Sequence, residues 1–280
     1  MFYHDGGKLQ YEVKVDKPDP VFAKALQQGI GGVQGEIRVC LQYMFQAWGA
    51  RGPSKYRDML LETATEEISH IEMLATAVAL NLEGAPLEME EASKDPMVYA
   101  KLGGMNIQHV IGTCMAAMPV DSEGVPFNCS HVYASGNIAA DMLANATAES
   151  TGRMLAVQLY RMTDDPGMKD MLSFMIARDT MHQEQWLAAW EELGGMKNHP
   201  IPNSFPQSHE SSDADAYTFY TLGKDSSVPQ PEGRWSSGES LDGNSTFKID
   251  RLTPRGEKPD LGTASPKAAV QESQFQKAAP

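Results

Sequence analysis

Four long segments with apolar residues at helical spacing constrain the fold of this 280-residue chain more than any other feature. They span residues 20–48, 54–82, 137–162 and 165–194. Each would form a helix about 42 Å long, since an α-helix rises about 1.5 Å per residue. Pro20 suits the first turn of the first helix, and Gly84 followed by Pro86 marks the end of the second. We therefore expect an all-α protein.

The connections between these segments differ in length. GARGP joins the first two helices and TDDPG joins the last two, so each pair should form an antiparallel hairpin. A long crossover, residues 84–136, separates the two hairpins. This connectivity is that of a ferritin-like four-helix bundle.

The first segment contains several glycines, Gly29, Gly31, Gly32 and Gly35. Each weakens a helix by up to about 1 kcal/mol relative to Ala. Their presence indicates that another backbone approaches this helix closely.

The chain divides into three parts by composition. Residues 1–19 form an N-terminal extension, residues 20–198 the bundle with its crossover, and residues 199–280 an extended, irregular C-terminal arm. An arm rich in Pro, Ser and Gly could be disordered. It nevertheless keeps aromatic residues that are unusual in a solvated linker: Tyr217, Phe219, Tyr220, Trp235 and Phe247. We favour an ordered arm that lies on the bundle or on a neighbouring subunit.

The formal net charge of −14 argues against nucleic acid and anionic membrane as partners, because both would repel the chain. No apolar run approaches the length that spans a bilayer. The N-terminus has neither the basic nor the apolar region of a signal peptide, so we expect a cytoplasmic protein. The three cysteines are far apart and fit neither a disulfide framework nor a zinc site.

Two of the four segments carry an acid three residues before a histidine. Glu67 and His70 have this spacing in the second segment, which brings their side chains together on one face. Asp179 and His182 repeat it in the fourth. Glu66 is rotated by about 100° from Glu67, which assigns it to the surface.

The other two segments each contribute one carboxylate. Glu36 lies in the first segment, and Glu149 lies in the third, where small residues leave room beside it. Tyr43 is seven residues after Glu36 and shares its face. It fits equally a core tyrosine bonded to a carbonyl and a residue that supports a metal ligand.

These clusters nearly match the pattern of dinuclear metal sites in helical bundles, one Glu from each of two helices and a Glu-x-x-His from each of the others. Buried carboxylates without a cation would repel one another, and their pKa values would rise. Two divalent metal ions remove this conflict, because carboxylates bridge metals and imidazole adds a nitrogen ligand. A lone Glu usually faces solvent, but the complete array predicts a dinuclear site.

With these motifs the chain resembles the manganese catalases, the non-haem catalases of bacteria. The resemblance covers the bundle, and its specific motifs are GGVQGEIR and EEISHIEMLA, with ARDTMHQEQW in the fourth segment and GRWSSGESLDGNSTF in the arm. It implies that Glu36 and His70 bind one metal and that Glu149 and His182 bind the second. Glu67 would bridge both.

The resemblance also implies a function: two manganese ions, no haem, and the disproportionation of hydrogen peroxide to water and oxygen. The metal pair would cycle between oxidation levels two electrons apart, at a separation of about 3.5–4 Å. Asp179 and Glu67 are candidates for moving protons, and Tyr43 for a hydrogen bond to a ligand carboxylate. Manganese catalases resemble one another in forming hexamers embraced by the C-terminal arm, which predicts a homohexamer here.

Two positions depart from the family pattern. Some members have an arginine just before the third-helix ligand and a glutamate three residues before the fourth-helix histidine, where this chain has Ala148 and Asp179. Asp179 is one methylene shorter than glutamate, so we expect an acid–base role through water instead of metal binding. The turnover rate and access to the site should differ accordingly.

Some manganese catalases also bind calcium, which makes Asp58 and Glu62, one turn apart in the second segment, candidate calcium ligands. Two surface acids explain this pair equally well. Two other functions remain open. The predicted ligands suit iron as well as manganese, which leaves an iron enzyme as one of them. One is a di-iron ferroxidase or peroxidase on the same bundle, and the other is a structural shell protein of the spore-coat type.

Overall fold

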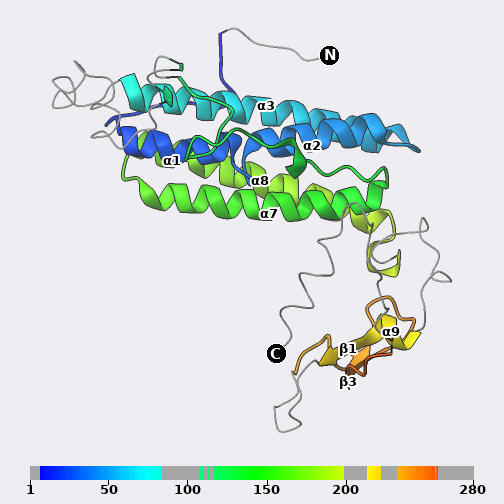
Figure 1. Cartoon of the computed structure of the whole chain (residues 1–280). Helices are drawn as coiled ribbons and strands as arrows, with labels where there is room; N and C mark the ends of the chain where they lie inside the picture. The colour runs from blue at the N-terminus through cyan, green and yellow to red at the C-terminus, as the bar shows by residue number, and fades with distance from the viewer. Residues whose placement is uncertain are drawn as a thin grey trace, which may run out of the picture. The chain divides into compact units, whose positions relative to one another are not determined.

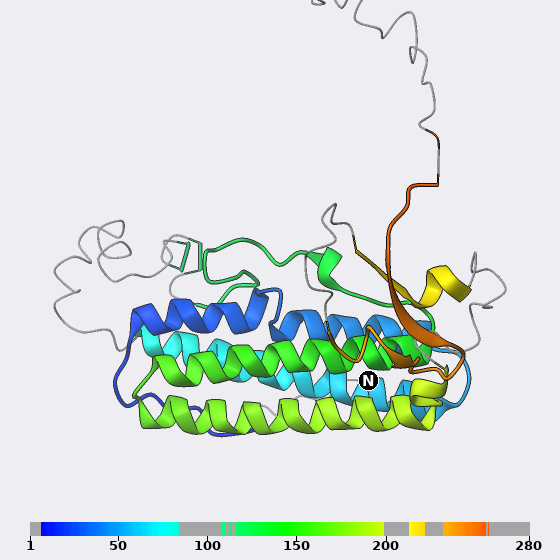
Figure 2. The same ribbon diagram turned by 90° about the horizontal axis from the view of Figure 1, so that it is seen from below.

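A computed structural model describes residues 7–83, 108–109, 112–113, 116–198, 213–221, 232–255 and 257. The long helices are α1 (Pro20–Gly31), α2 (Glu36–Gly49), α3 (Ser54–Glu83), α7 (Ile138–Met162) and α8 (Pro166–Glu192). α1 and α2 follow one another in one row, which runs beside α3, α7 and α8 (Figure 1, Figure 2). α1 and α2 pack on α3, and α7 packs on α8, so the expected helical bundle is present. None of the described helices is long and apolar enough to cross a membrane.

The prediction of one continuous first helix is wrong, because the structure divides it between α1 and α2. The glycines at the break allow the chain to pack closely on itself. A Cβ atom at Gly32 would lie 2.4 Å from the carbonyl oxygen of Gln28, and one at Gly35 would lie 2.7 Å from that of Gly29. The break makes Glu36 the first residue of α2.

The close approach of another backbone, expected from the glycines, occurs at Gly31. A Cβ atom there would lie 2.4 Å from the carbonyl oxygen of Val120 in the crossover. Gln27 fixes the same segment, because its amide donates to that oxygen at 2.9 Å and accepts from the Met118 N–H at 3.1 Å. Residues 116–136 therefore run along α1 and α2 (Figure 1). Most of the remaining predicted crossover, 84–136, lies outside the described residues.

Asp165 joins the N-terminal extension to the bundle. Its Oδ1 accepts a hydrogen bond from the Met168 N–H at 3.0 Å and so caps α8. Its Oδ2 accepts from the N–H groups of Asp16 and Lys17, both at 2.8 Å. One carboxylate thus begins a helix and holds the extension beside it.

Two hydrophobic clusters fill the bundle. One includes Leu26, Met73 and Leu172, and the other includes Leu60 and Trp186. The bundle has four rows of helix: α1 followed by α2, then α3, α7 and α8. In each row, the predicted metal-binding residues lie between the stretches that contribute to these two clusters. The apolar packing on both sides thus holds a polar layer within the bundle.

The chain forms two compact units, Met1–His209 and Glu210–Pro280. The sequence predicts an irregular arm, but the described part of the second unit contains regular structure: α9 (Asp213–Tyr217), β1 (Thr218–Thr221), β2 (Gly238–Glu239) and β3 (Thr246–Arg251). The sheet has the order β1-β3-β2, with β1 parallel and β2 antiparallel to β3. Phe219 lies opposite Ile249 in this sheet, so β-favouring residues of the arm pair with one another.

Candidate metal centre

Glu67 lies between the two histidines of the polar layer. Its Oε2 is 2.7 Å from Nδ1 of His70, and its Oε1 is 2.8 Å from Nδ1 of His182. The two imidazole rings stack with their centroids 5.7 Å apart. All three side chains are buried. One carboxylate on α3 therefore contacts the imidazole of its own helix and that of α8.

Glu36 and Glu149 complete two groups of potential ligand atoms. One group contains Glu36, Glu67 and His70, the other contains Glu67, Glu149 and His182, and within each the ligand atoms lie within 4.8 Å of one another. Nδ1 of His70 is 3.9 Å from Glu36, and Nδ1 of His182 is 3.6 Å from Glu149. The structure thus brings together the five predicted ligands, and Glu67 belongs to both groups.

Two buried polar atoms within these groups have no hydrogen bond among the described residues and fit a bound cation. Oε1 of Glu67 and Nδ1 of His182 are buried, and within the described part of the chain neither has a hydrogen bond, although only 2.8 Å separates them. Buried polar groups without a partner destabilise a fold. A divalent ion between them would satisfy both, and mixed carboxylate and imidazole donors suit manganese or iron.

Burial and neighbouring charges shift the pKa values of the three carboxylates. Burial, followed by the charge of Glu67, raises the pKa of Glu36 to about 8. Burial also raises the pKa of Glu149, and the charge of Glu67 adds to this effect. Burial acts in the same direction on Glu67, but the neighbouring His70 and His182 lower its pKa to about 2.

On the pKa values of the two histidines, burial and the neighbouring carboxylates act in opposite directions. Burial alone would lower the pKa of each imidazole, but the surrounding carboxylates raise the pKa values of His70 and His182 above their ordinary value. Without metal, protonated imidazoles therefore balance the negative charge of this layer. A metal ion that binds there must displace those protons.

Tyr43 and Trp186 hold Glu149 in place. The Tyr43 hydroxyl donates a hydrogen bond to Oε1 of Glu149. The Trp186 Nε1–H donates to the same oxygen at 3.5 Å. The two aromatic rings contact each other, with centroids 4.8 Å apart. The sequence pattern indicated Tyr43 but not Trp186. Trp186 lies four residues after His182 on α8 and so shares its face, a spacing that could have indicated it.

Asp179 lies near the centre but outside both ligand groups in the described residues. Its side chain is buried, and a Cβ atom on Gly152 would lie 4.0 Å from its Oδ2. Burial, followed by the charges of Glu36 and Glu149, raises the pKa of Asp179 well above its ordinary value. It is therefore a buried acid beside the carboxylates that can hold a proton.

The assignment of Glu66 to the surface is wrong. Its Oε2 lies 3.0 Å from Nε2 of His182, and its Oε1 lies 3.7 Å from Nε2 of His70. Arg178 donates two hydrogen bonds to Glu66, at 2.6 and 3.1 Å, and Gln10 donates a third at 2.7 Å. The available signal was the spacing of four residues between Glu66 and His70, which also places two side chains together on a helix.

A very small cavity, about 10 Å³, adjoins Glu36. Its lining comes from all four rows and is mainly apolar, with Gly29, Gln34, Gly152 and Met175 among its members. The Glu36 side chain is 13% exposed, whereas those of Glu67, His70, Glu149 and His182 are at most 4% exposed. The cavity thus lies on the least enclosed side of the centre.

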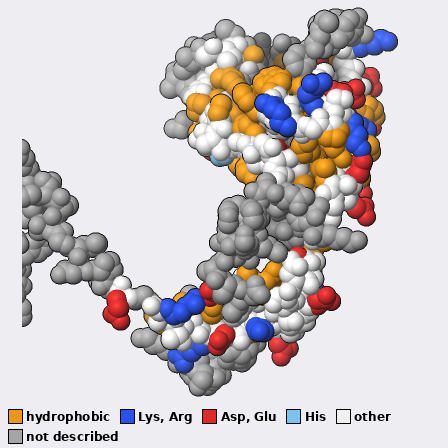
Figure 3. Space-filling view, turned by 90° about the vertical axis from the view of Figure 1, so that its right-hand side faces the viewer, with side chains coloured by type: hydrophobic (Ala, Val, Ile, Leu, Met, Phe, Trp, Pro, Cys, Tyr) orange, Lys and Arg blue, Asp and Glu red, His pale blue; other side chains and the backbone are white. Residues whose placement is uncertain are grey.

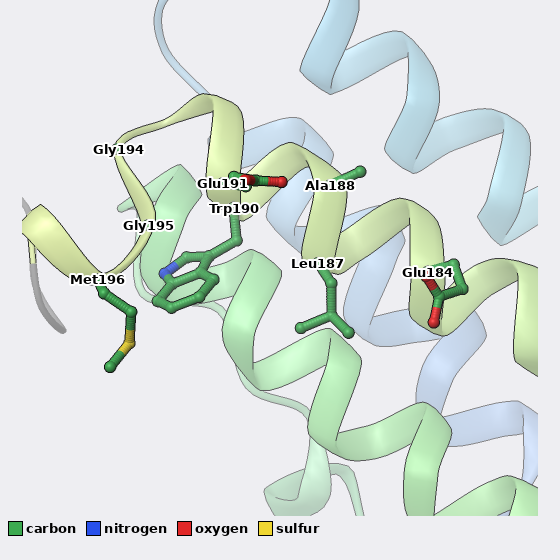
Figure 4. Close-up of a pocket in the computed structure, with 8 residues that line it drawn as sticks. All are labelled: Glu184, Leu187, Ala188, Trp190, Glu191, Gly194, Gly195 and Met196. Carbon is green, nitrogen blue, oxygen red and sulfur yellow. The ribbon is translucent and has the colours of Figure 1, made fainter.

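A separate pocket lies at the C-terminal end of α8 (Figure 4). Leu187, Trp190 and Met196 line it together with Glu184 and Glu191. None of the five predicted metal ligands lines this pocket. The two candidate ligand groups therefore lie apart from this pocket.

The candidate calcium ligands lie outside that layer. Asp58 and Glu62 are both exposed on α3. Asp58 pairs with Arg57, whose Nη2 lies 3.3 Å from its Oδ1. Neither acid joins a ligand group in the part of the chain that the structure describes, so a calcium site stays a prediction.

The fold and the buried layer define a class of protein, a helical bundle with buried carboxylate–histidine groups that can hold metal ions. The model of the manganese containing catalase family matches residues 1–280. A manganese catalase of Bacillus subtilis is 45% identical over 267 residues, which cover 95% of this chain and 96% of the relative. One of Lactiplantibacillus plantarum is 41% identical over 193 residues, or 69% and 72% of the two chains. This chain belongs to the manganese catalase family.

A solved structure shows the same fold. KatB, a manganese catalase from Anabaena, superposes with a TM-score of 0.70 and 24% sequence identity. The match covers 89% of this chain and 99% of KatB. The ferritin-like architecture predicted from the sequence is confirmed.

Proposed function

We propose that this protein disproportionates hydrogen peroxide to water and oxygen at two manganese ions. Glu36 and His70 would hold one ion, Glu149 and His182 the other, and Glu67 would bridge them. The observation that carries this proposal is the position of Glu67, whose two oxygens lie 2.7 and 2.8 Å from the two histidines. Bound manganese supplies the reversible two-electron change that peroxide chemistry requires.

The residues of the chain would manage the protons of this reaction. One peroxide loses two protons and two electrons to become oxygen, and another takes up two of each to become two waters. Asp179 is buried beside the carboxylates but belongs to neither group of potential metal ligands. It can therefore hold a proton between the two halves of the cycle. Glu67 is the second candidate. Tyr43 would keep Glu149 oriented through its hydrogen bond.

The departures from the family pattern act near this site. Ala148 is buried directly before Glu149 and presents a methyl group where some members have an arginine. No cationic side chain from this position can reach the centre. We infer that proton transfer depends more strongly on Asp179 than in members that have the arginine.

We further propose that the protein is a cytoplasmic homo-oligomer, with a hexamer as the expected form. Hydrophobic side chains are exposed at the end of the bundle drawn in Figure 3. Phe45 and Trp48, each more than half exposed, contact each other on α2 with ring centroids 5.1 Å apart. Such aromatic pairs contribute most when a partner covers them. A calcium ion bound by Asp58 and Glu62 would be a separate metal site, outside the dinuclear centre.

Elemental analysis and an oxygen electrode test the proposed function. Purified protein should contain close to two manganese ions per chain and release oxygen from peroxide. Iron uptake without oxygen release would instead favour the ferroxidase. Neither metal nor activity, together with a defect in assembly when the protein is removed, would favour a structural shell protein.

A further inference from the structure

We propose that Glu66 is a shared positioning residue, one carboxylate that orients both histidine ligands of the metal centre. This inference rests on the proposed function in one respect, that His70 and His182 bind the metal ions. It extends that function by adding a part of the chain that the five ligands do not include.

The two edges of each imidazole ring face different carboxylates. The Nδ1 atoms of His70 and His182 face Glu67 at 2.7 and 2.8 Å. The Nε2 atoms face Glu66 at 3.7 and 3.0 Å. Nδ1 and Nε2 lie on different edges of the ring, so Glu66 approaches the edge opposite to the one that faces Glu67. It is therefore placed to hold the rings and not to share the metal ions.

A carboxylate in this position determines how each ring presents its other nitrogen. A metal-binding histidine usually donates its remaining N–H to a carboxylate or carbonyl, which fixes the ring and makes the ligand nitrogen more basic. Glu66 has an oxygen beside each histidine, so it can do this for both. Two consecutive residues of α3 would then act on the same two rings, Glu67 from the metal side and Glu66 from the outer side.

Glu66 is itself held inward by three N–H donors from two residues. Arg178 contributes two N–H groups, an arrangement that adds both charge and directional specificity. Gln10, from the N-terminal extension, donates to Oε1 at 2.7 Å. With 21% of its side chain exposed, Glu66 could turn toward water, but these donors keep it against the histidines. The extension, α3 and α8 thus meet at one carboxylate.

The two histidines are not held equally. His182 lies within hydrogen-bonding distance of Glu66, whereas 3.7 Å from His70 is too long for a hydrogen bond. Nε2 of His70 is buried, and no described residue provides its hydrogen-bond partner. A small movement of the His70 ring toward Glu66 would supply that partner. We expect this movement when metal binds to Nδ1.

The substitution Glu66→Gln tests the proposal with little change of volume. A glutamine can accept from one histidine through its oxygen, but its NH₂ group opposes the N–H of the other. Loss of an outer partner typically costs about 10–100-fold in metal affinity, so manganese titration of the metal-free protein should show weaker binding of this order. The electron paramagnetic resonance spectrum of the bound manganese should also change.

Glu72→Gln is the matched control, because it removes the same charge from α3. Within the described part of the chain, the Glu72 side chain makes no hydrogen bond or ion pair. Its manganese titration and spectrum should equal those of the wild type. Arg178→Lys is a second test that keeps the charge but loses the paired hydrogen bonds. It should weaken binding less than Glu66→Gln does, with unchanged helical circular dichroism.

The outcomes separate this inference from the proposed function. A folded Glu66→Gln variant with the manganese affinity and spectrum of the wild type would overturn the role of Glu66 alone. A variant that fails to fold leaves the decision to Arg178→Lys, for which wild-type binding would be equally decisive. A wild-type protein that binds no manganese would overturn both the proposed function and this inference.

Discussion

Oε1 of Glu67 and Nδ1 of His182 lie 2.8 Å apart without forming a hydrogen bond. The two atoms belong to different helices, which the packing of the bundle brings together. Their approach is electrostatically favourable only while the imidazole carries a proton or a cation lies between them. This contact therefore links the protonation of the centre to its occupancy by metal.

Manganese binding should release protons. The neighbouring carboxylates raise the pKa values of His70 and His182 above the ordinary value. Both rings are therefore positively charged imidazolium groups near neutral pH in the metal-free protein. Metal displaces those protons, and its apparent affinity should rise with pH by about tenfold per unit for each proton released. Calorimetric titration in two buffers of different ionisation enthalpy measures the release. Equal heats in both buffers would contradict the prediction.

Glu67→Ala and His70→Ala should each abolish activity, because each removes a predicted ligand. Glu67 belongs to both ligand groups, so its loss should empty both positions, whereas loss of His70 acts first on one. We expect either change to exceed the about 100-fold effect of losing an outer partner. Metal content and oxygen release check this. A variant that keeps wild-type metal and rate would show that the ligand assignment is wrong.

Asp179→Asn should keep the metal and slow the reaction. Asparagine has nearly the same shape but cannot hold and release the proton, and general acid–base catalysis typically contributes about 10²–10⁴-fold. We expect kcat to fall by at least about 100-fold while the manganese content stays the same. Elemental analysis beside steady-state kinetics distinguishes the alternatives. Loss of manganese would instead make Asp179 a ligand.

Much of the bundle could be predicted because its signals are local. The second predicted helix, 54–82, matches α3 to within one residue, and Asn137 and Asp165 begin α7 and α8 as N-caps. The spacing of acids and histidines is also informative, because helical geometry alone decides which side chains share a face. Sequence therefore indicated which residues meet in the polar layer.

The features that sequence missed depend on distant parts of the chain. The break before Glu36 accompanies the approach of Val120 to Gly31, a contact between segments far apart in sequence. The inward position of Glu66 requires Arg178 and Gln10 from other elements. The sheet of the second unit likewise pairs β1 with β3 across an intervening segment. Local periodicity contains no information about such pairings.

Filling the cavity beside Glu36 should slow the reaction without removing the metal. A Cβ atom at Gly152 would lie 3.4 Å from the Gln34 carbonyl oxygen, so Gly152→Ala should be tolerated. The branched side chain of Gly152→Val should extend into the space next to Glu36 and Asp179 and lower kcat/KM. Gly49→Val is the control, because no described atom lies within 4 Å of a Cβ there. An unchanged kcat/KM for Gly152→Val would exclude a role in access.

Removal of the C-terminal arm should weaken assembly and leave the centre of each bundle in place. The second unit exposes Phe219 and Trp235, which are 44% and 53% exposed in the single chain, and a partner subunit would cover such residues. The five predicted ligands all belong to the first unit, so we expect them to stay in place without the arm. Truncation after residue 200 should therefore lower the mass measured by light scattering and the melting temperature, with manganese still bound. An unchanged hexamer after truncation would reject the role of the arm, and a monomeric full-length protein would reject the proposed assembly.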